Sequence, residues 1–299
     1  MKVLLTGAGG QLGQALVESK PKDVQLIATT RQTLNLADTD ACAAAIETHQ
    51  PDWVLNAGAY TAVDKAESEP ELAQAVNAEA PRAFAEALTK HGGRLLQIST
   101  DFVFNGTQGT PYRVDTHKQP LGVYGTTKAA GEDFIQDVMD TSSGRALILR
   151  TSWVIGPVGR NFALTMLRLH REREQLGVVA DQVGCPSSTL NLANACWRCL
   201  ELGTKQFLPP LMHWSDAGAA SWYDVAVAVG QIGKELGLLD QPAEVNPITT
   251  ADYPTPATRP AYSLLDSTDT YQALDLKPTH WQLALRTILE RLKKLIEIS

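Results

Sequence analysis

The stretch TGAGGQLG, residues 6–13, decides the fold of this chain. It follows a short apolar segment, 2–6, that is typical of a buried strand, and it leads into a segment, 11–19, that is typical of a helix. Its glycines recur every third residue. Glycine lacks Cβ and tolerates unusual φ, so the backbone can turn tightly and approach a pyrophosphate. The N–H groups at the helix start attract phosphate. Strand, turn and helix in this order predict a dinucleotide-binding turn.

Strand-like and helix-like segments alternate through the first half of the chain. Strands are predicted at 24–30, 51–59, 93–100 and 145–154, and helices at 41–49, 70–90 and 124–140. Pro81 lies inside the second of these helices, so we expect either two helices or one kinked helix there. Short apolar strands alternating with helices indicate a sheet that is buried on both faces. The predicted fold class is α/β, a Rossmann-type doubly wound parallel sheet.

The regular alternation ends near residue 155. We predict a dinucleotide-binding Rossmann domain over 1–155, to which parts of 185–215 return, and a smaller C-terminal substrate-binding lobe over most of 156–299. Helical patterns near 161–175, 191–202 and 221–238 are separated by stretches with prolines, 184–188, 208–214 and 253–262, that are expected to be irregular. Apolar residues at helical spacing in 283–298 predict a packed terminal helix.

Composition excludes several classes of protein. The 299 residues carry a formal net charge of −7 and are 44% hydrophobic, as in an ordinary globular protein. Neither a basic face for nucleic acid nor an apolar run of about 18 residues for a membrane is present. The apolar run after Lys2 is too short for a signal peptide, so a cytoplasmic protein is expected. Cys196 and Cys199 form C-x-x-C, but no second pair completes a metal site, and we expect them to be structural.

The end of the second strand bears on the cofactor. NAD-specific folds place an acid there, whereas this chain has Thr30-Arg31. Arg31 is either a contact for the 2′-phosphate of NADP or a solvated loop residue. We expect NADPH, with NADH possible. The residues predicted to hold the cofactor are Gly7, Gly10, Gln11, Leu12, Gly13, Thr30, Arg31, Asn35, Leu36, Ala59, Tyr60, Thr61, Ser99, Tyr124 and Lys128.

The stretch GVYGTTKAAGE, 122–132, places Tyr124 four residues before Lys128. In a helix such a pair shares one face, and by itself it indicates no more than a lysine packed on a tyrosine ring. Together with the dinucleotide turn and Ser-Thr-Asp at 99–101, the pair resembles the extended short-chain dehydrogenase/reductase superfamily. The resemblance implies that Tyr124 donates a proton to the substrate oxygen, which the Thr100 hydroxyl also contacts. Lys128 then binds the nicotinamide ribose and, with the cationic nicotinamide ring, lowers the phenol pKa.

The pair Asp101-Phe102, next to Thr100, bears on the type of reaction. Sugar-nucleotide dehydratases of the superfamily carry an Asp-Glu pair where this chain has Asp101-Phe102. Removal of water across a C–C bond needs an acid and a base, and phenylalanine is neither. A dehydratase is therefore disfavoured.

Further motifs resemble the dTDP-4-dehydrorhamnose reductase family: NAGAYTAVDKAE (56–67), STDFVFNG (99–106), TSWV (151–154), DQVGCPS (181–187) and TRPAYSLLD (258–266). The resemblance implies NAD(P)H-dependent reduction of the 4-keto group of dTDP-4-dehydro-L-rhamnose. It implies substrate contacts from Thr100, Asp101, Tyr124, Trp153, Asn161 and Arg259. An indole suits the apolar face of a deoxyhexose, although Trp153 as a core residue remains an alternative.

The chain departs from the family pattern at two positions that matter here. Asn35 stands where an aspartate is frequent, and Ala15 stands where some members carry a glutamate linked to a magnesium-bridged dimer. We therefore expect no metal and either a monomer or a homodimer. Two other functions stay open. One is a non-catalytic NADP-binding regulatory subunit like that of methionine adenosyltransferase. The other is a 4-epimerase with permanently bound NAD, which the missing acid near residue 30 disfavours.

Overall fold

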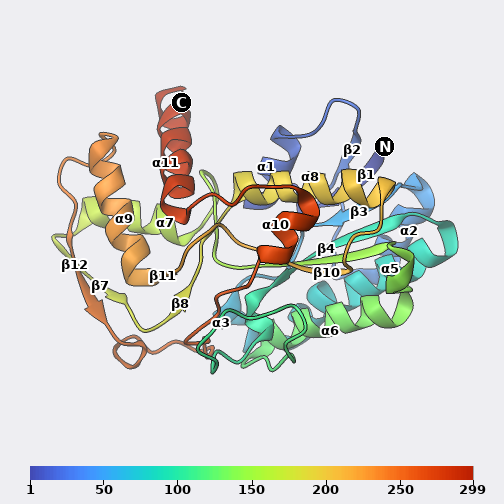
Figure 1. Cartoon of the computed structure of the whole chain (residues 1–299), viewed down its shortest axis with the longest axis horizontal. Coiled ribbons are helices and arrows are strands. Elements are labelled where there is room, and N and C mark those ends of the chain that lie inside the picture. The colour runs from blue at the N-terminus through green and yellow to red at the C-terminus, as the bar shows by residue number, and fades with distance from the viewer. Residues whose placement is uncertain (299) are drawn as a thin grey trace.

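The core of the molecule is a parallel β-sheet. In the computed structural model, which describes residues 1–298, six strands pair in the order β10-β5-β4-β3-β1-β2 (Figure 1). Every pairing in this sheet is parallel. The strands are β1 (Lys2–Thr6), β2 (Gln25–Ala28), β3 (Trp53–Asn56), β4 (Arg94–Thr100), β5 (Ala146–Thr151) and β10 (Leu211–Trp214). The predicted fold class is confirmed.

Helices cover both faces of this sheet because successive strand residues point to opposite sides. In β1, Val3 and Leu5 pack with α1 (Gln11–Glu18) and α8 (Thr189–Lys205). Leu4 packs on the other face with α2 (Thr39–His49), α5 (Ala80–His91) and α6 (Val123–Val138). The side chains of Val3, Leu4 and Leu5 are fully buried. This two-sided burial is the reason for the continuous apolar runs in the strands.

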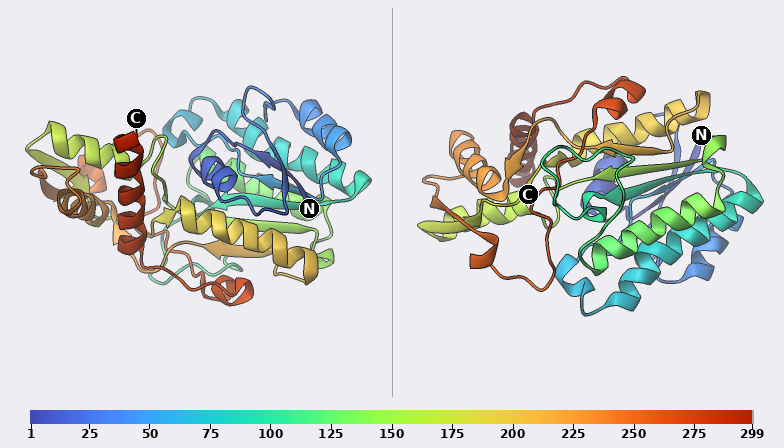
Figure 2. Two further views of the ribbon diagram at one scale, coloured as in Figure 1. Left: turned by 90° about the horizontal axis from the view of Figure 1, so that it is seen from above. Right: turned by 60° about the horizontal axis from the view of Figure 1, so that its bottom comes forward.

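The second half of the chain builds a smaller lobe beside one end of the sheet (Figures 1 and 2). Its main elements are α7 (Phe162–Glu172), β7 (Gln175–Val179), α9 (Trp222–Glu235), β12 (Glu244–Ile248) and α11 (Trp281–Ile298). They share a separate apolar core that includes Leu167, Val229 and Leu285. Short pairs of β6 (Val154–Ile155) with β9 (Ser187–Ser188), and of β8 (Val183–Gly184) with β11 (Ala220–Ser221), lie between the two bodies of the molecule.

The predicted helix around Pro81 is three consecutive segments. They are α4 (Pro70–Gln74), a π-helical turn η1 (Ala75–Glu79) and α5, with Pro81 in the first turn of α5. A proline is tolerated there because its missing N–H has no partner to lose. The remaining elements are α3 (Val63–Ala66), η2 (Asp101–Val103), η3 (Thr141–Ser143), η4 (Thr250–Asp252) and α10 (Thr268–Leu274).

Two stretches expected to be irregular contain strands: Ser187–Ser188 in 184–188 forms β9, and the second stretch joins the main sheet. We predicted an irregular stretch over 208–214, yet Leu211–Trp214 forms β10 at the edge of the main sheet and pairs with β5. Four residues after a proline pair are too few to show a period-two pattern, so the sequence did not indicate this strand. It forms because it pairs with β5. α8 and β10 thus bring the chain back to the sheet, while the exact domain limits, 1–155 and 156–299, stay predictions.

Candidate active site

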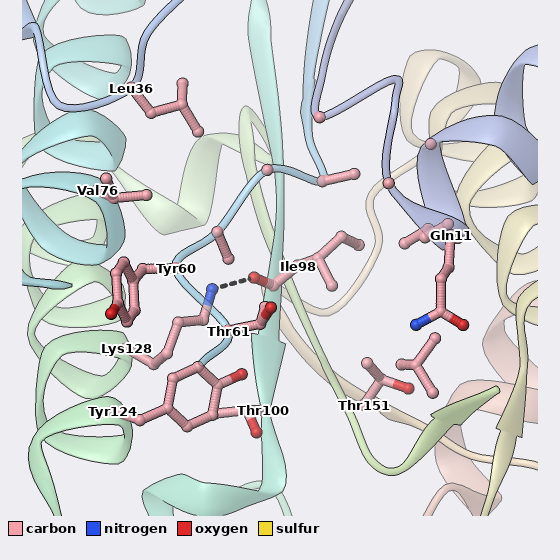
Figure 3. Close-up of a pocket in the computed structure, with 18 of the residues that line it drawn as sticks. Gln11, Leu36, Tyr60, Thr61, Val76, Ile98, Thr100, Tyr124, Lys128 and Thr151 are labelled. Carbon is pink, nitrogen blue, oxygen red and sulfur yellow. Dashed lines mark hydrogen bonds between the residues drawn. The ribbon is translucent and has the colours of Figure 1, made fainter. Parts of the chain in front are cut away.

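The carboxyl ends of the strands open into a cavity of about 800 Å³ between the sheet and the smaller lobe. This is where ligands bind in open α/β sheets, at the position where the strand order reverses. β4 and β5 contribute their terminal residues, α6 contributes its first two turns, and the smaller lobe contributes Arg160, Trp222 and Arg259. Part of this lining is drawn in Figure 3. All the residues predicted to hold the cofactor line this cavity.

At one wall of the cavity, the glycine turn presents backbone without side chains. Gly7 has φ of +69°, and a Cβ on it would lie 2.7 Å from Gly58. A Cβ on Gly13 would lie 2.0 Å from the Gly7 carbonyl oxygen. Gly10 precedes α1 and offers no side-chain cap, and the first turn of α1 has no acid. The free N–H groups of α1 therefore face the cavity without a protein partner, which fits the pyrophosphate of a dinucleotide.

The adenine end of the cavity is formed by the loops after β2 and β3. Arg31 is exposed, and Asn35 accepts a hydrogen bond from Ala37 N at 3.2 Å. Tyr60 donates its hydroxyl to Glu69 at 2.5 Å. The cavity residues in this part have no acidic side chain at the position expected for NAD. The arrangement fits a dinucleotide whose ribose carries a 2′-phosphate beside Arg31.

α6 and β4 bring the predicted catalytic residues together. Figure 3 shows the Tyr124 ring and the Lys128 side chain pointing from α6 toward β4, where Thr100 ends the strand. α6 approaches closely because residue 125 is glycine, and a Cβ on Gly125 would lie 2.2 Å from the Phe102 carbonyl oxygen. The Thr100 hydroxyl is within hydrogen-bonding reach of the Tyr124 phenol and also donates to Asp101 Oδ1 at 3.0 Å.

Burial sets the protonation of this pair. It raises the pKa of Tyr124 to about 12, with Thr100 opposing the rise, and it lowers the pKa of Lys128 to about 8. The expected lowering of the phenol pKa involves the cationic nicotinamide ring as well as Lys128, and the chain alone does not show it. The Lys128 Nζ donates to the Ile98 carbonyl oxygen at 2.6 Å, and desolvation is the largest cause of the pKa shift at the phenol. The phenol therefore holds its proton at neutral pH.

Asp101 is buried beside these groups. Burial raises the pKa of its carboxyl to about 6, and hydrogen bonds from Ser263 and Thr100 oppose this rise. A carboxyl with such a pKa changes charge close to neutral pH, and such groups concentrate in functional sites. Asp101 can therefore either accept hydrogen bonds from a sugar hydroxyl as a carboxylate or donate one as an acid.

A buried ion pair holds the middle of α6. Arg150 on β5 donates to both carboxylate oxygens of Glu132, at 2.9 and 2.7 Å. Burial of Glu132 favours its neutral form, but the Arg150 guanidinium outweighs it and holds the pKa of Glu132 below its usual range. Glu132 lies one turn after Lys128, and its charge favours the Lys128 ammonium. The pair thus joins α6 to the sheet.

An aromatic wall faces the catalytic groups from the smaller lobe. Trp153 has φ of +45° and stacks on Trp222, with ring centroids 3.6 Å apart and planes 8° apart. Phe162 packs against the other side of Trp222. The Trp222 indole donates to Gln182 at 3.2 Å. This wall supplies an apolar surface that suits a deoxyhexose.

Sequence reasoning missed Trp222 and Arg160, which also line the cavity. A signal existed for Trp222. Ser221 and Asp224 form a capping box, the pattern S-x-x-D, which places residue 222 in the first turn of α9. Arg160 had no local pattern of its own, because its position depends on contacts with the other half of the chain.

Two predicted substrate residues have other contacts. Asn161 does not line the cavity. Its side chain caps α7 by accepting from Leu164 N at 3.0 Å, and it donates to Gln11 at 2.8 Å. Arg259 lines the cavity and forms an ion pair with Asp64 at 2.8 Å. The assignment of both to substrate binding stays a prediction.

Comparison with known proteins places this site in a family. Residues 1–294 match the family described as the RmlD substrate binding domain. The chain belongs to that family. Among the described residues, no helix is long and apolar enough to cross a membrane, and no cluster of three or more His, Cys, Asp or Glu side chains is arranged to hold a metal ion.

Members of the RmlD substrate binding domain family with known names match along nearly the whole chain. A dTDP-4-dehydrorhamnose reductase from Aggregatibacter actinomycetemcomitans is 38% identical, over 96% of this chain and 98% of its own length. A probable dTDP-4,6-dihydroxy-2-methyloxan-3-one 4-ketoreductase from Streptomyces antibioticus is 39% identical, over 96% and 94%. The solved structure of dTDP-4-dehydrorhamnose reductase from Bacillus anthracis in complex with NADP has a TM-score of 0.88 at 30% identity, covering 97% of this chain and 99% of that one.

Proposed function

We propose that this protein is an NADPH-dependent dTDP-4-dehydrorhamnose reductase, which converts the 4-keto group of dTDP-4-dehydro-L-rhamnose to the hydroxyl of dTDP-L-rhamnose. The observation that carries the proposal is the meeting of Tyr124, Lys128 and Thr100 in the cavity that also holds the glycine turn. The reductases that match over almost the full chain support it.

The chain's own residues supply the proton and the positioning. The bound dinucleotide supplies a hydride to C4 of the sugar. Tyr124 donates its phenolic proton to the carbonyl oxygen, and the Thr100 hydroxyl hydrogen-bonds the same oxygen. Burial keeps the phenol protonated until this transfer, because it raises the pKa of Tyr124 to about 12. The Lys128 ammonium stabilises the phenolate that remains.

NADPH is the proposed cofactor because the end of β2 carries Arg31 and no acid. Named relatives of two kinds act on dTDP-sugars, so the substrate class is a dTDP-linked 4-ketosugar, and the rhamnose precursor is the specific proposal. The proposal extends to a cytoplasmic enzyme that works as a monomer or homodimer. Cell fractionation and size-exclusion chromatography test these two points.

The decisive experiment follows NADPH oxidation with enzymatically prepared dTDP-4-dehydro-L-rhamnose. Wild-type protein should turn over, and Tyr124→Phe should lose about a hundredfold or more in kcat, since it cannot donate the proton. Tyr253→Phe is the matched control, because Tyr253 is exposed and lies outside the cavity. Absence of turnover in wild-type protein that still binds NADPH would contradict the proposal and favour the regulatory-subunit function.

A further inference from the structure

The two bodies of the molecule meet at the residue that opens the phosphate-binding helix. Gln11 is the first residue of α1, and its side-chain amide bonds in both directions to the loop before α7. Its Nε2 donates to the Arg160 carbonyl oxygen at 3.1 Å. Its Oε1 accepts from Asn161 Nδ2 at 2.8 Å. Figure 3 shows Gln11 across the cavity from Lys128. The contact joins the start of α1 to the smaller lobe.

The loop that carries Arg160 is held firmly on both sides. Gly159 has φ of +75°, and a Cβ on it would lie 3.0 Å from the Gln11 side chain. On the other side, Asn161 caps α7 through Leu164 N and also donates to the Gly156 carbonyl oxygen at 2.9 Å. The backbone of Arg160 is therefore fixed beside the glycine turn, while its side chain is exposed.

The Arg160 guanidinium has no assigned protein partner within residues 1–298. Carboxylates hold Arg150 and Arg259, the first in the core and the second at the cavity. Arg160 lines the same cavity as Gly9 and Gly10, and no carboxylate or carbonyl of the described chain is paired with it. Together with the uncapped, acid-free start of α1, it adds positive charge to this side of the cavity.

We propose that Arg160 binds the pyrophosphate of the dinucleotide, so that the smaller lobe completes the cofactor site. The inference rests on the proposed use of NADPH. The recognised chemistry is a diphosphate, which the nucleotide-sugar substrate also carries. The position beside Gly9, Gly10 and Gln11 favours the cofactor, because that turn is where the backbone N–H groups are free. Arg suits this role because its planar guanidinium bonds two phosphate oxygens at once.

The role predicts a binding pattern that differs from that of Arg31. Titrations of NADPH and NADH, followed by nucleotide fluorescence, compare wild type with Arg160→Met, Arg31→Met and the control Arg168→Met. Arg160→Met should weaken both nucleotides about tenfold, because both carry the pyrophosphate. Arg31→Met should weaken NADPH alone. Arg168 lies on the same lobe, pairs with Glu172 and should change neither affinity. Arg160→Lys should recover part of the loss.

Nucleotide fragments sharpen the assignment. ADP-ribose contains the pyrophosphate, whereas adenosine 2′-monophosphate contains the 2′-phosphate and neither phosphate of the pyrophosphate. Arg160→Met should weaken the first about tenfold and leave the second unchanged. The salt dependence of NADH binding should also decrease, because one ionic contact with phosphate is lost.

Three outcomes would overturn the inference. Arg160→Met could bind both dinucleotides as wild type does, could lose affinity for NADPH alone, or could lose affinity for dTDP alone. The last result would assign Arg160 to the substrate. These outcomes leave the proposed function intact as long as wild-type protein binds NADPH. Wild-type protein that binds neither dinucleotide would overturn the proposed function and this inference together.

Discussion

Desolvation dominates the chemistry of single residues in this site. Burial at the edge of the sheet keeps Tyr124 protonated and lowers the pKa of Lys128 to about 8, so that the ammonium still predominates at physiological pH. A buried acid suits the reductive direction, since the phenol must hold its proton until the carbonyl oxygen gains charge. The lysine then becomes the group that limits activity at high pH.

The rate of reduction should fall above about pH 8. Burial lowers the pKa of Lys128 to about 8, so its stabilising charge is present below that pH and lost as the pH rises through it. The Tyr124 phenol, with its pKa raised to about 12, contributes no loss in this range. A profile of kcat against pH from 6 to 10 measures this. Lys128→Met, with low residual activity, should lack the alkaline decline; a wild-type rate that stays level to pH 10 would contradict the assignment.

Asp101→Asn should stabilise the protein at neutral pH. The pKa of the folded carboxyl is raised from 3.8 to about 6, so the folded state binds more protons and loses stability as pH rises through that window. The cost at pH 7.5 is about 3 kcal/mol. Urea unfolding of both proteins at pH 4 and pH 7.5 measures it. The variant should gain at pH 7.5 and gain little at pH 4, whereas an equal difference at both pH values would sink the explanation.

At the scale of elements, the position of α6 decides whether the site exists. The helix presents Tyr124 and Lys128 on one face, as their spacing predicts, but spacing does not fix its distance from β4. Two glycines let α6 pack closely on η2, which directly follows β4, and on η1: a Cβ on Gly125 would meet the Phe102 carbonyl oxygen, and one on Gly131 would lie 2.2 Å from the Asn77 carbonyl oxygen. The packing of α6 therefore requires glycine at positions 125 and 131.

Gly125→Ala should lower kcat even though alanine has a higher helix propensity than glycine. Alanine favours a helix over glycine by up to about 1 kcal/mol, but the added Cβ must push α6 away from η2. The phenol then moves away from Thr100, and kcat should fall at least about tenfold while the NADPH dissociation constant changes much less. Gly109→Ala is the control, since its Cβ would meet nothing within 4 Å. A wild-type kcat in the Gly125 variant would refute this reading of the helix.

Breaking the buried ion pair between Arg150 and Glu132 should lower the free energy of unfolding, and a second substitution should restore much of it. Arg150→Met leaves the buried Glu132 carboxylate without its bidentate partner and with only the Lys118 ammonium at 3.5 Å, which should cost up to about 3–5 kcal/mol. The double variant with Glu132→Gln removes the poorly compensated charge and should recover much of that loss. Urea unfolding gives the four free energies of a double-mutant cycle. Additive losses would show that the two side chains do not act as a pair.

At the scale of the whole molecule, the cavity belongs to both bodies of the chain. Arg259 comes from the segment before α10, and Asp64 from α3, so their ion pair joins residues 195 positions apart. Arg259 also donates to the carbonyl oxygen of Ala257. The guanidinium is therefore held in one orientation at the cavity wall, which suits the predicted contact of Arg259 with the substrate.

Asp64→Asn should weaken substrate binding without affecting the cofactor. The neutral amide no longer orients Arg259 through two charge-assisted bonds, so KM for the dTDP-sugar should rise several-fold. Steady-state kinetics and NADPH titration measure the two effects. Glu172→Gln removes an exposed partner of Arg168 on the smaller lobe and should change neither value. A shift in NADPH affinity alone would contradict the role given to this pair.

Local patterns in the sequence were enough to predict much of the fold and many of the residues that line the cavity. The glycine turn, the alternation of strands and helices, the Tyr124–Lys128 spacing and the Pro81 interruption all depend on residues within a few positions of one another. Such patterns set backbone angles and hydrogen bonds inside one segment, so they predicted the α/β fold and the residues at the strand ends. The family motifs did the same for the proposed reaction.

Only the tertiary structure decided the rest, because burial and long-range pairing are not local properties. The pKa of Tyr124 in the chain alone follows from how much water the fold removes, and burial raises it to about 12. β10 is a strand because β5 lies beside it, and Trp222 lines the site because it stacks on Trp153. Arg160 lines the cavity because Gln11, about 150 residues earlier, holds its loop there. Each of these depends on two segments that meet only after folding.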